Sequence, residues 1–146
     1  LTRRCVQGGR MNQWRHKDEW RQGGNGFLVQ VTRHSIDHAP PSFDDGLQRW
    51  AVYAYIYPSH RLFGEFNGND MWQPAALSLP LHSGPSLLRW HRDEDGNPTS
   101  VQVGADYNHL YDDKYTFYIT VEAAASIFAD AEELFRFLSD PVEVVA

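Results

Sequence analysis

The chain has 146 residues, of which 42% are apolar and 14% aromatic, and it carries a formal net charge of −6. This length corresponds to about one domain, and the composition excludes wholesale disorder. A single cysteine excludes a fold held by internal disulfides. No apolar run reaches the ~18–20 residues of a membrane-spanning helix, and the start shows no signal-peptide pattern, so we expect a cytoplasmic protein.

Charge is unevenly distributed. Residues 1–33 contain seven Lys and Arg residues against two acids, which gives +5 and leaves −11 for the remainder. The sequence therefore predicts a basic, poorly ordered or loosely docked N-terminal segment over residues 1–25 and a single domain over residues 26–146. Nucleic acid is an open but unfavoured partner, because the cations are scattered and no nucleic-acid motif accompanies them.

In chain order, the first expected elements are a short helical turn over residues 14–20, ended by the glycines near Gly24, and a strand over residues 27–32. Residues 35–47 are rich in proline and aspartate, as in a loop. The clearest strand covers residues 50–57, where period-two alternation separates two faces. One face carries Trp50, Val52, Ala54 and Ile56, and the other carries Ala51, Tyr53, Tyr55 and Tyr57.

Further strands follow. Residues 77–81 alternate again, although Pro80 restricts them to an edge or bulged strand. Residues 86–91 and 100–106 flank Asp95-Gly96, which predicts a β-hairpin. A last short strand is expected over residues 115–119.

A long helix is predicted from Thr120, its N-cap, to the residue before Asp140-Pro141, about 19 residues in all. Apolar side chains recur there at spacings of three and four. They are Val121, Ala124, Ile127, Phe128, Ala131, Leu134, Phe135 and Leu138. Strands first and one helix last predict an α+β fold, with an antiparallel sheet of about four to six strands and the C-terminal helix packed on one face.

Histidines and aspartates follow the predicted strands. His60 comes after the tyrosine-bearing strand, His82 lies between the edge strand and the hairpin, and Asp106 and His109 follow the hairpin. The three-residue spacing of Asp106 and His109 lets a carboxylate orient an imidazole. Such residues also cap turns, so the same positions fit a structural role. No His-Glu-x-x-His, cysteine-pair or close His-x-His spacing occurs. His34 and His38 have the four-residue gap that suits zinc on a helix, but Pro40-Pro41 follows and makes a helix there unexpected, so the sequence assigns no metal site and identifies no cofactor.

These segments resemble a group of small, uncharacterised bacteriophage and prophage proteins. The group carries His-Pro-Leu-x-Gly, Val/Leu-His-Gly-Gly and Gly-x-Asp-x-x-His-x-Gly-Asp elements before a C-terminal helix. The matching residues are His60, Leu62, Gly64, Leu81, His82, Gly84, Gly104, Asp106, His109 and Asp112. The resemblance implies a phage-type accessory protein in the host cytoplasm, and no particular activity. Arg61 replaces the proline of the pattern, and Ser83 and Tyr111 replace two glycines, so these loops depend on bulkier residues reaching positive φ.

The first functional hypothesis is a binding protein, whose partner is a small polar molecule, such as a nucleotide signal, or a host defence protein. The expected ligand-binding residues are His60, His82, Asp106, His109, Asp112, Tyr53 and Tyr55. The second hypothesis is a small hydrolase or lyase with Asp106 and His109 as an acid–base pair, with or without metal. A third is a structural phage component, or homo-oligomer, built on exposed aromatic residues. We favour the first over an enzyme, because no recognisable nucleophile is present, and the enzyme stays an open alternative.

Overall fold

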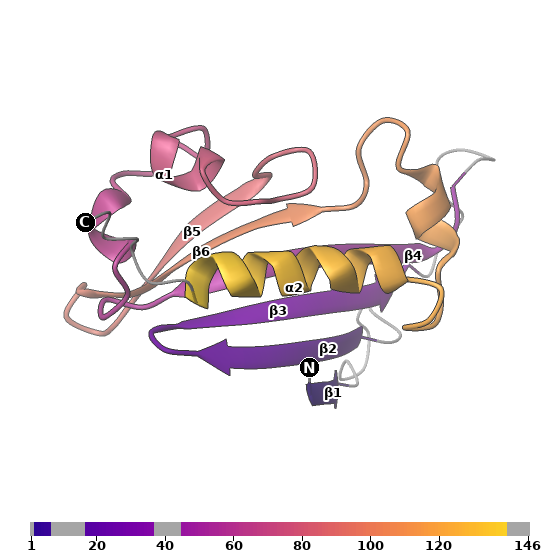
Figure 1. Cartoon of the computed structure of the whole chain (residues 1–146), viewed down its shortest axis with the longest axis horizontal. Helices are drawn as coiled ribbons and strands as arrows, with labels where there is room; N and C mark the ends of the chain where they lie inside the picture. Colours follow the sequence, from indigo (N-terminus) through magenta and orange to yellow (C-terminus); the bar gives the residue numbers. More distant parts are fainter. Residues whose placement is uncertain (1, 7–16, 37–44, 140–146) are drawn as a thin grey trace, which may run out of the picture.

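The computed structural model describes residues 2–6, 17–36 and 45–139, which form a six-stranded antiparallel sheet and a C-terminal helix (Figure 1). The order of the strands across the sheet is β1-β2-β3-β4-β6-β5. The strands are β1 (Thr2–Val6), β2 (Lys17–Gly24), β3 (Phe27–Ser35), β4 (Gln48–Ile56), β5 (Leu87–Arg92) and β6 (Pro98–Asp106). The predicted strands at 27–32 and 50–57 and the predicted hairpin are confirmed as β3, β4 and the β5–β6 pair.

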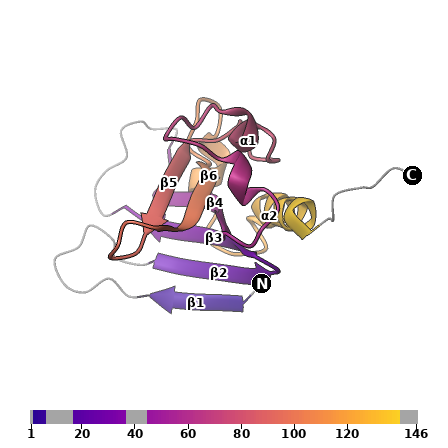
Figure 2. The same ribbon diagram turned by 90° about the vertical axis from the view of Figure 1, so that its left-hand side faces the viewer.

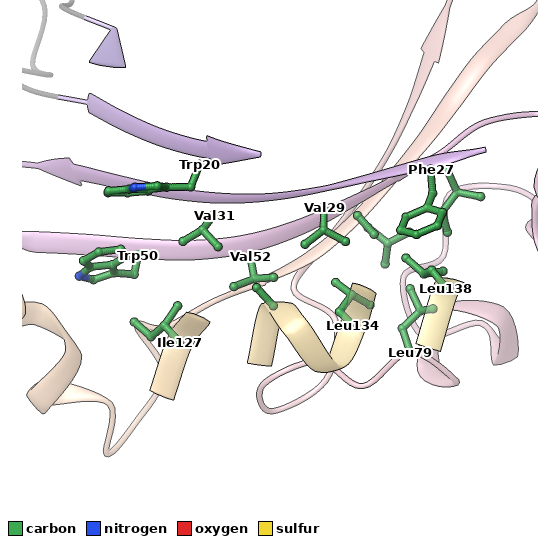
Figure 3. Close-up of a cluster of buried hydrophobic side chains, with 14 of the residues drawn as sticks. Trp20, Phe27, Val29, Val31, Trp50, Val52, Leu79, Ile127, Leu134 and Leu138 are labelled. Carbon is green, nitrogen blue, oxygen red and sulfur yellow. The ribbon is translucent and has the colours of Figure 1, made fainter. Parts of the chain in front are cut away.

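Helix α2 (Ala125–Ser139) lies across one face of the sheet, over β2, β3 and β4 (Figures 1 and 2). The α+β class and the position of the helix are therefore as the sequence predicts. The face beneath α2 carries the aliphatic set of β4, which packs with Trp20, Val29 and Val31 against Ile127 and Leu134 (Figure 3). The hydrophobic core thus lies between one helix and one face of the sheet.

The helix begins five residues later than the predicted N-cap. Thr120 Oγ1 accepts a hydrogen bond from the backbone N–H of Ala123 at 3.1 Å, so this threonine closes a turn that precedes α2. Val121 is 40% exposed and does not join the core, whereas Ala124 is fully buried. The apolar stripe is confirmed from residue 124 onward, and α2 has 15 residues.

Two expected strands are wrong. Residues 74–77 form the short helix α1 (Pro74–Leu77), and Leu79 turns into the core (Figure 3). The segment expected as the last strand falls mostly in the 3-10 helix η2 (Asp113–Phe117). The carbonyl of Tyr118, which follows η2, accepts a hydrogen bond from the Trp50 indole at 3.0 Å. A side chain of β4, rather than a strand ladder, therefore bonds this backbone group to the sheet.

The N-terminal part also differs from expectation. Residues 17–20, expected in a helical turn, belong to β2, which pairs with β3 along its whole length. Asp18 and Trp20 are buried on the helix side of the sheet, and Asp18 forms an ion pair with Arg33 of β3. The described part of the expected loose segment is thus integral to the sheet, because it supplies both a core tryptophan and a buried ion pair. No helix in the described part of the chain is both long and apolar enough to cross a membrane.

Candidate functional site

The face of the sheet opposite α2 is polar, and no described helix covers it (Figure 2). Its side chains form rows that cross the strands. Arg21 of β2 pairs with Gln30 of β3, which pairs with Tyr53 of β4, which pairs with Gly104 of β6. The predicted separation of aliphatic and tyrosine side chains on the two faces of β4 is therefore confirmed, and the tyrosines lie on this open face.

A cavity of about 610 Å³ lies on the open face. Its walls come from five strands and the loop after β6. The lining residues are Lys17, Glu19, Arg21, Gln30, Thr32, His34, Arg49, Trp50, Ala51, Tyr53, Tyr55, Leu87, Arg89, His91, Gln102, Asp106 and Asn108. This volume lies within the roughly 300–1,000 Å³ typical of sites for small molecules.

The cavity is electropositive although the protein is acidic. Lys17, Arg21, Arg49 and Arg89 face it against two carboxylates, so its formal charge is +2, in a chain of −6. Glu19 is already paired with Lys17 at 3.7 Å and with Arg21 at 3.0 Å.

Two donors on this face are not satisfied by the described protein. The guanidinium of Arg89 forms no hydrogen bond or ion pair within the described part of the chain. The Nε atom of Arg21 is buried and lacks a hydrogen-bond partner among those residues. The buried Nε of Arg21 is out of reach of a ligand, whereas the guanidinium of Arg89 is exposed to the cavity and can donate to an anion.

The two tyrosines lie in the middle of this cavity. The hydroxyl of Tyr55 donates to Oε1 of Gln30 at 3.3 Å, and the ring lies 5.7 Å from the ring of His91. Burial raises the pKa of Tyr53 and of Tyr55, so both hydroxyls stay protonated near neutral pH. They therefore offer hydrogen-bond donors and flat apolar faces to a ligand.

The pKa of His34 reflects its burial and the positive charge around it. Burial, followed by the positive charges of Lys17 and Arg49, lowers the pKa of His34 to about 4. The imidazole is therefore neutral at pH 7 and adds no charge to the cavity.

A second group of polar residues lies near the end of β6. Nε2 of His82 lies 2.9 and 3.0 Å from the two oxygens of Asp112, and Nδ1 of His109 lies 3.1 Å from Oδ2 of Asp112. The backbone N–H of His109 donates to the same Oδ2 at 2.9 Å. Burial pushes the pKa of Asp112 upward, but these hydrogen bonds outweigh burial and hold the pKa below its usual range. Asp112 is therefore a buried carboxylate anion that orients two imidazoles.

The position of His82 is fixed by aromatic rings. Its imidazole stacks on Tyr107 with ring centres 4.3 Å apart and planes 13° apart, and it meets the ring of Tyr115 edge-on at 5.3 Å. The Tyr107 hydroxyl donates to Asp130 of α2 at 2.6 Å. Through Tyr107, the helix thus holds the histidine in place.

Backbone strain accompanies this group. Within the described chain, the non-glycine residues with positive φ are Ser83 at 58° and Tyr111 at 74°. They directly follow His82 and precede Asp112, and they occupy the two positions where the phage-protein pattern has glycine. Both side chains therefore reach the conformation on which these loops depend, at an energetic cost.

The expected site residues separate into three places. His82, His109 and Asp112 come together, and Asp106 lies beside them, with Oδ1 3.6 Å from Nδ1 of His109. Asp112, rather than Asp106, is the carboxylate nearer to His109. Tyr53 and Tyr55 line the open-face cavity, to which Asp106 also contributes.

His60 lies elsewhere, at the C-terminal end of α2. Its Nδ1 accepts from the backbone N–H of Leu62 at 3.1 Å, and Nε2 donates to the carbonyl of Leu138 at 2.8 Å. The expectation that His60 joins a common site is wrong, because both of its ring nitrogens bond to backbone groups. Arg61 donates to the Leu138 carbonyl as well.

The cationic residues of the cavity were not predicted as site residues. In the predicted strand 86–91, Arg89 and His91 alternate with Leu88 and Trp90, which assigns the first two to the open face. That alternation was a usable signal for Arg89. For Arg21 there was none, because residues 14–20 read as a helical turn. Comparisons with protein-family models, curated proteins and solved structures found no match to this chain.

Proposed function

We propose that this protein binds a small anionic molecule with a planar ring, such as a nucleotide, in the cavity on the open face of the sheet. The observation that carries the proposal is the excess of four cations over two carboxylates around a tyrosine-bearing cavity in a chain of net charge −6. In an acidic protein, a cationic patch that its own carboxylates only partly neutralise concentrates anions locally.

Different residues of the cavity would contact the anionic group and the planar ring of such a ligand. Arg89 and Arg21 supply guanidinium donors for phosphate or carboxylate oxygens. Tyr53 and Tyr55 supply ring faces, and Gln30 and Gln102 supply amides for the edge of a base. Since both amides also bond to neighbouring residues, the cavity is largely formed before a ligand arrives.

The resemblance to phage-encoded proteins suggests what such binding is for. A phage-type accessory protein that sequesters a nucleotide signal of its host would counter a host defence. A host defence protein as the partner is the alternative, and the nucleotide titration below distinguishes the two.

Isothermal titration calorimetry with AMP, cyclic AMP, ATP and inorganic phosphate tests the proposal. We expect at least one nucleotide to bind at a 1:1 ratio, and Arg89→Gln to weaken it about 10- to 100-fold, the equivalent of one charge-assisted hydrogen bond. Arg92→Gln is the matched control, since Arg92 lies on the same strand but faces Trp90 rather than the cavity. It removes the same charge and should leave affinity within about twofold.

The salt dependence gives a second readout, because affinity should fall as ionic strength rises. The proposal fails if no member of the panel binds, or if Arg89→Gln and Arg92→Gln weaken binding equally.

A second candidate is acid–base catalysis in a hydrolase. The observation in its favour is the contact between Asp112 and Nδ1 of His109, which leaves Nε2 of a carboxylate-oriented imidazole for a substrate. A screen with phosphodiester substrates tests it, with His109→Ala as the variant. Hydrolysis that persists in His109→Ala removes this candidate.

A further inference from the structure

We infer that His82, His109 and Asp112 bind a divalent transition-metal ion, for which Zn²⁺ has the best-matched ligand set. This metal site lies outside the proposed anion cavity, and the inference does not depend on that cavity binding a nucleotide. Each residue offers one ligand atom, and the three atoms all lie within 4.8 Å of one another.

The distances suit an ion without rearrangement of the backbone. Zinc lies about 2.0–2.2 Å from imidazole nitrogen and carboxylate oxygen, so the ligand atoms of a tetrahedral site are about 3.4 Å apart. The shortest distances from Asp112 oxygens to His82 Nε2 and His109 Nδ1 are 2.9 and 3.1 Å. Side-chain rotations that widen these two distances by about 0.3–0.5 Å, and that bring the two ligand nitrogens, now within 4.8 Å of each other, to a similar spacing, would admit the ion.

The ligand types select the class of metal. Two imidazole nitrogens with one carboxylate oxygen suit zinc and its first-row neighbours, whereas Mg²⁺ and Ca²⁺ prefer ligand sets made of oxygen alone. The carboxylate of Asp112 carries the negative charge that offsets the cation, and Asp112 is 6% exposed. A cation bound here would therefore be partly removed from water.

The surroundings hold the ligands in place. The imidazole of His82 stacks on Tyr107, and Tyr107 is itself held by its hydrogen bond to Asp130, so the orientation of the imidazole is restricted. The backbone N–H of His109 holds an oxygen of Asp112 from the side. Such outer contacts typically change metal affinity by about 10–100-fold, because they limit the freedom of the ligands.

One side of the group remains accessible. The side chains of His82 and His109 are 20% and 32% exposed, and Asp106 reaches within 3.6 Å of His109 Nδ1. Three protein ligands with an accessible fourth position is the arrangement found in catalytic zinc sites. Because Asp106 also lines the anion cavity, a bound ion would lie at the edge of that cavity.

The competing interpretation is a hydrogen-bonded His–Asp–His group that serves only stability. The two interpretations differ in what is measured. The metal site predicts stoichiometric binding that depends on all three side chains, whereas the hydrogen-bonded group predicts a loss of stability in variants and no binding.

The test uses the full chain without an affinity tag, first treated with a chelator. Titration with Co²⁺, followed by visible absorption, and with Zn²⁺, followed by calorimetry, should each show one site. The variants His109→Gln and Asp112→Asn should weaken Zn²⁺ binding at least about tenfold. His91→Gln is the matched control, because His91 bonds to Gln102 on the open face and should leave the site intact.

Thermal unfolding supplies a readout for each variant. Zn²⁺ should raise the Tm of the wild-type protein and of His91→Gln, but not that of His109→Gln. If Asp112→Asn does not fold, the partly exposed His109 still provides the decisive variant. The inference is overturned if the wild-type protein shows no 1:1 binding of either ion, or if His109→Gln binds Zn²⁺ as tightly as the wild type.

Discussion

Tyr53 of β4 lies directly opposite Gly104 of β6, and its ring occupies the space that a side chain on Gly104 would fill. A Cβ atom on Gly104 would lie 2.2 Å from Cδ1 of Tyr53 and 2.5 Å from the carbonyl oxygen of Val52. The glycine thus allows the tyrosine to extend over the neighbouring strand, across the floor of the cavity. A glycine in the middle of a strand costs stability unless close packing requires it.

The substitution Gly104→Ala should therefore lower the free energy of unfolding by about 1–3 kcal/mol, the cost of overpacking. Chemical denaturation measures this change. Gly23→Ala on β2 is the control, since a Cβ there meets no atom within 4 Å. We expect no loss of stability in Gly23→Ala. Similar losses in both variants would contradict the role of Gly104 as space for the tyrosine ring.

His34 should make stability depend on pH. Its pKa in the folded protein, about 4, is below the ordinary histidine pKa of 6.5, so protonation favours the unfolded chain. The stabilisation that neutral His34 provides is complete above pH 6.5 and is lost as the pH falls from 6.5 towards about 4.

The measurement is denaturant unfolding at several pH values for the wild type and for His34→Gln. The difference in stability between the two proteins should change across this range and stay constant above pH 7. A difference that does not vary with pH would contradict the depressed pKa of His34.

The sequence predicted those elements whose side chains follow one simple period. The alternation along β4 and the three-and-four spacing along α2 are both visible because apolar residues alone face the core. The strand prediction failed for β2, because Asp18 occupies the core-facing position next to Trp20. The partner of Asp18 is Arg33, which lies on β3. An ion pair in the core removes the apolar alternation on which strand prediction depends.

Part of the candidate site could also be predicted. Polar residues after the end of β6 located His109 and Asp112, whereas His82 was selected as the residue after a strand that does not form. Which carboxylate pairs with which imidazole depends on the loop from Tyr107 to η2, whose course depends on positive φ at Tyr111. The cavity on the open face depends on strand order, because Arg21 and Arg89 come from strands far apart in the chain.

His60 should contribute to stability and not to binding. In His60→Ala, the backbone N–H of Leu62 loses its acceptor and the carbonyl of Leu138 loses one of its donors. We expect the free energy of unfolding to fall by about 1–3 kcal/mol. The affinities for nucleotide and for Zn²⁺, measured by calorimetry on the folded variant, should remain those of the wild type. A selective loss of either affinity would return His60 to the functional site.

Tyr111 should destabilise the fold that it belongs to. The residue is 87% exposed, so its side chain gains little from packing, while its φ of 74° is unfavourable for any residue with a Cβ. A left-handed conformation costs a residue with a Cβ about 1–2 kcal/mol, and glycine removes this cost. The flexibility that glycine adds to the unfolded chain takes back about 0.5–1 kcal/mol of the stability gained. Tyr111→Gly should therefore raise the free energy of unfolding by about 0.5–1 kcal/mol.

Leu110→Gly is the control for this prediction, because Leu110 is similarly exposed, at 81%, but does not have positive φ. Glycine there should give no gain in stability. Denaturant unfolding of the two variants compares a strained and an unstrained position one residue apart. If both variants lose stability equally, the left-handed conformation of Tyr111 is not a source of strain. If Tyr111→Gly is the more stable, the loop that presents Asp112 is held against its own backbone preference by the contacts of Asp112 with His82 and His109.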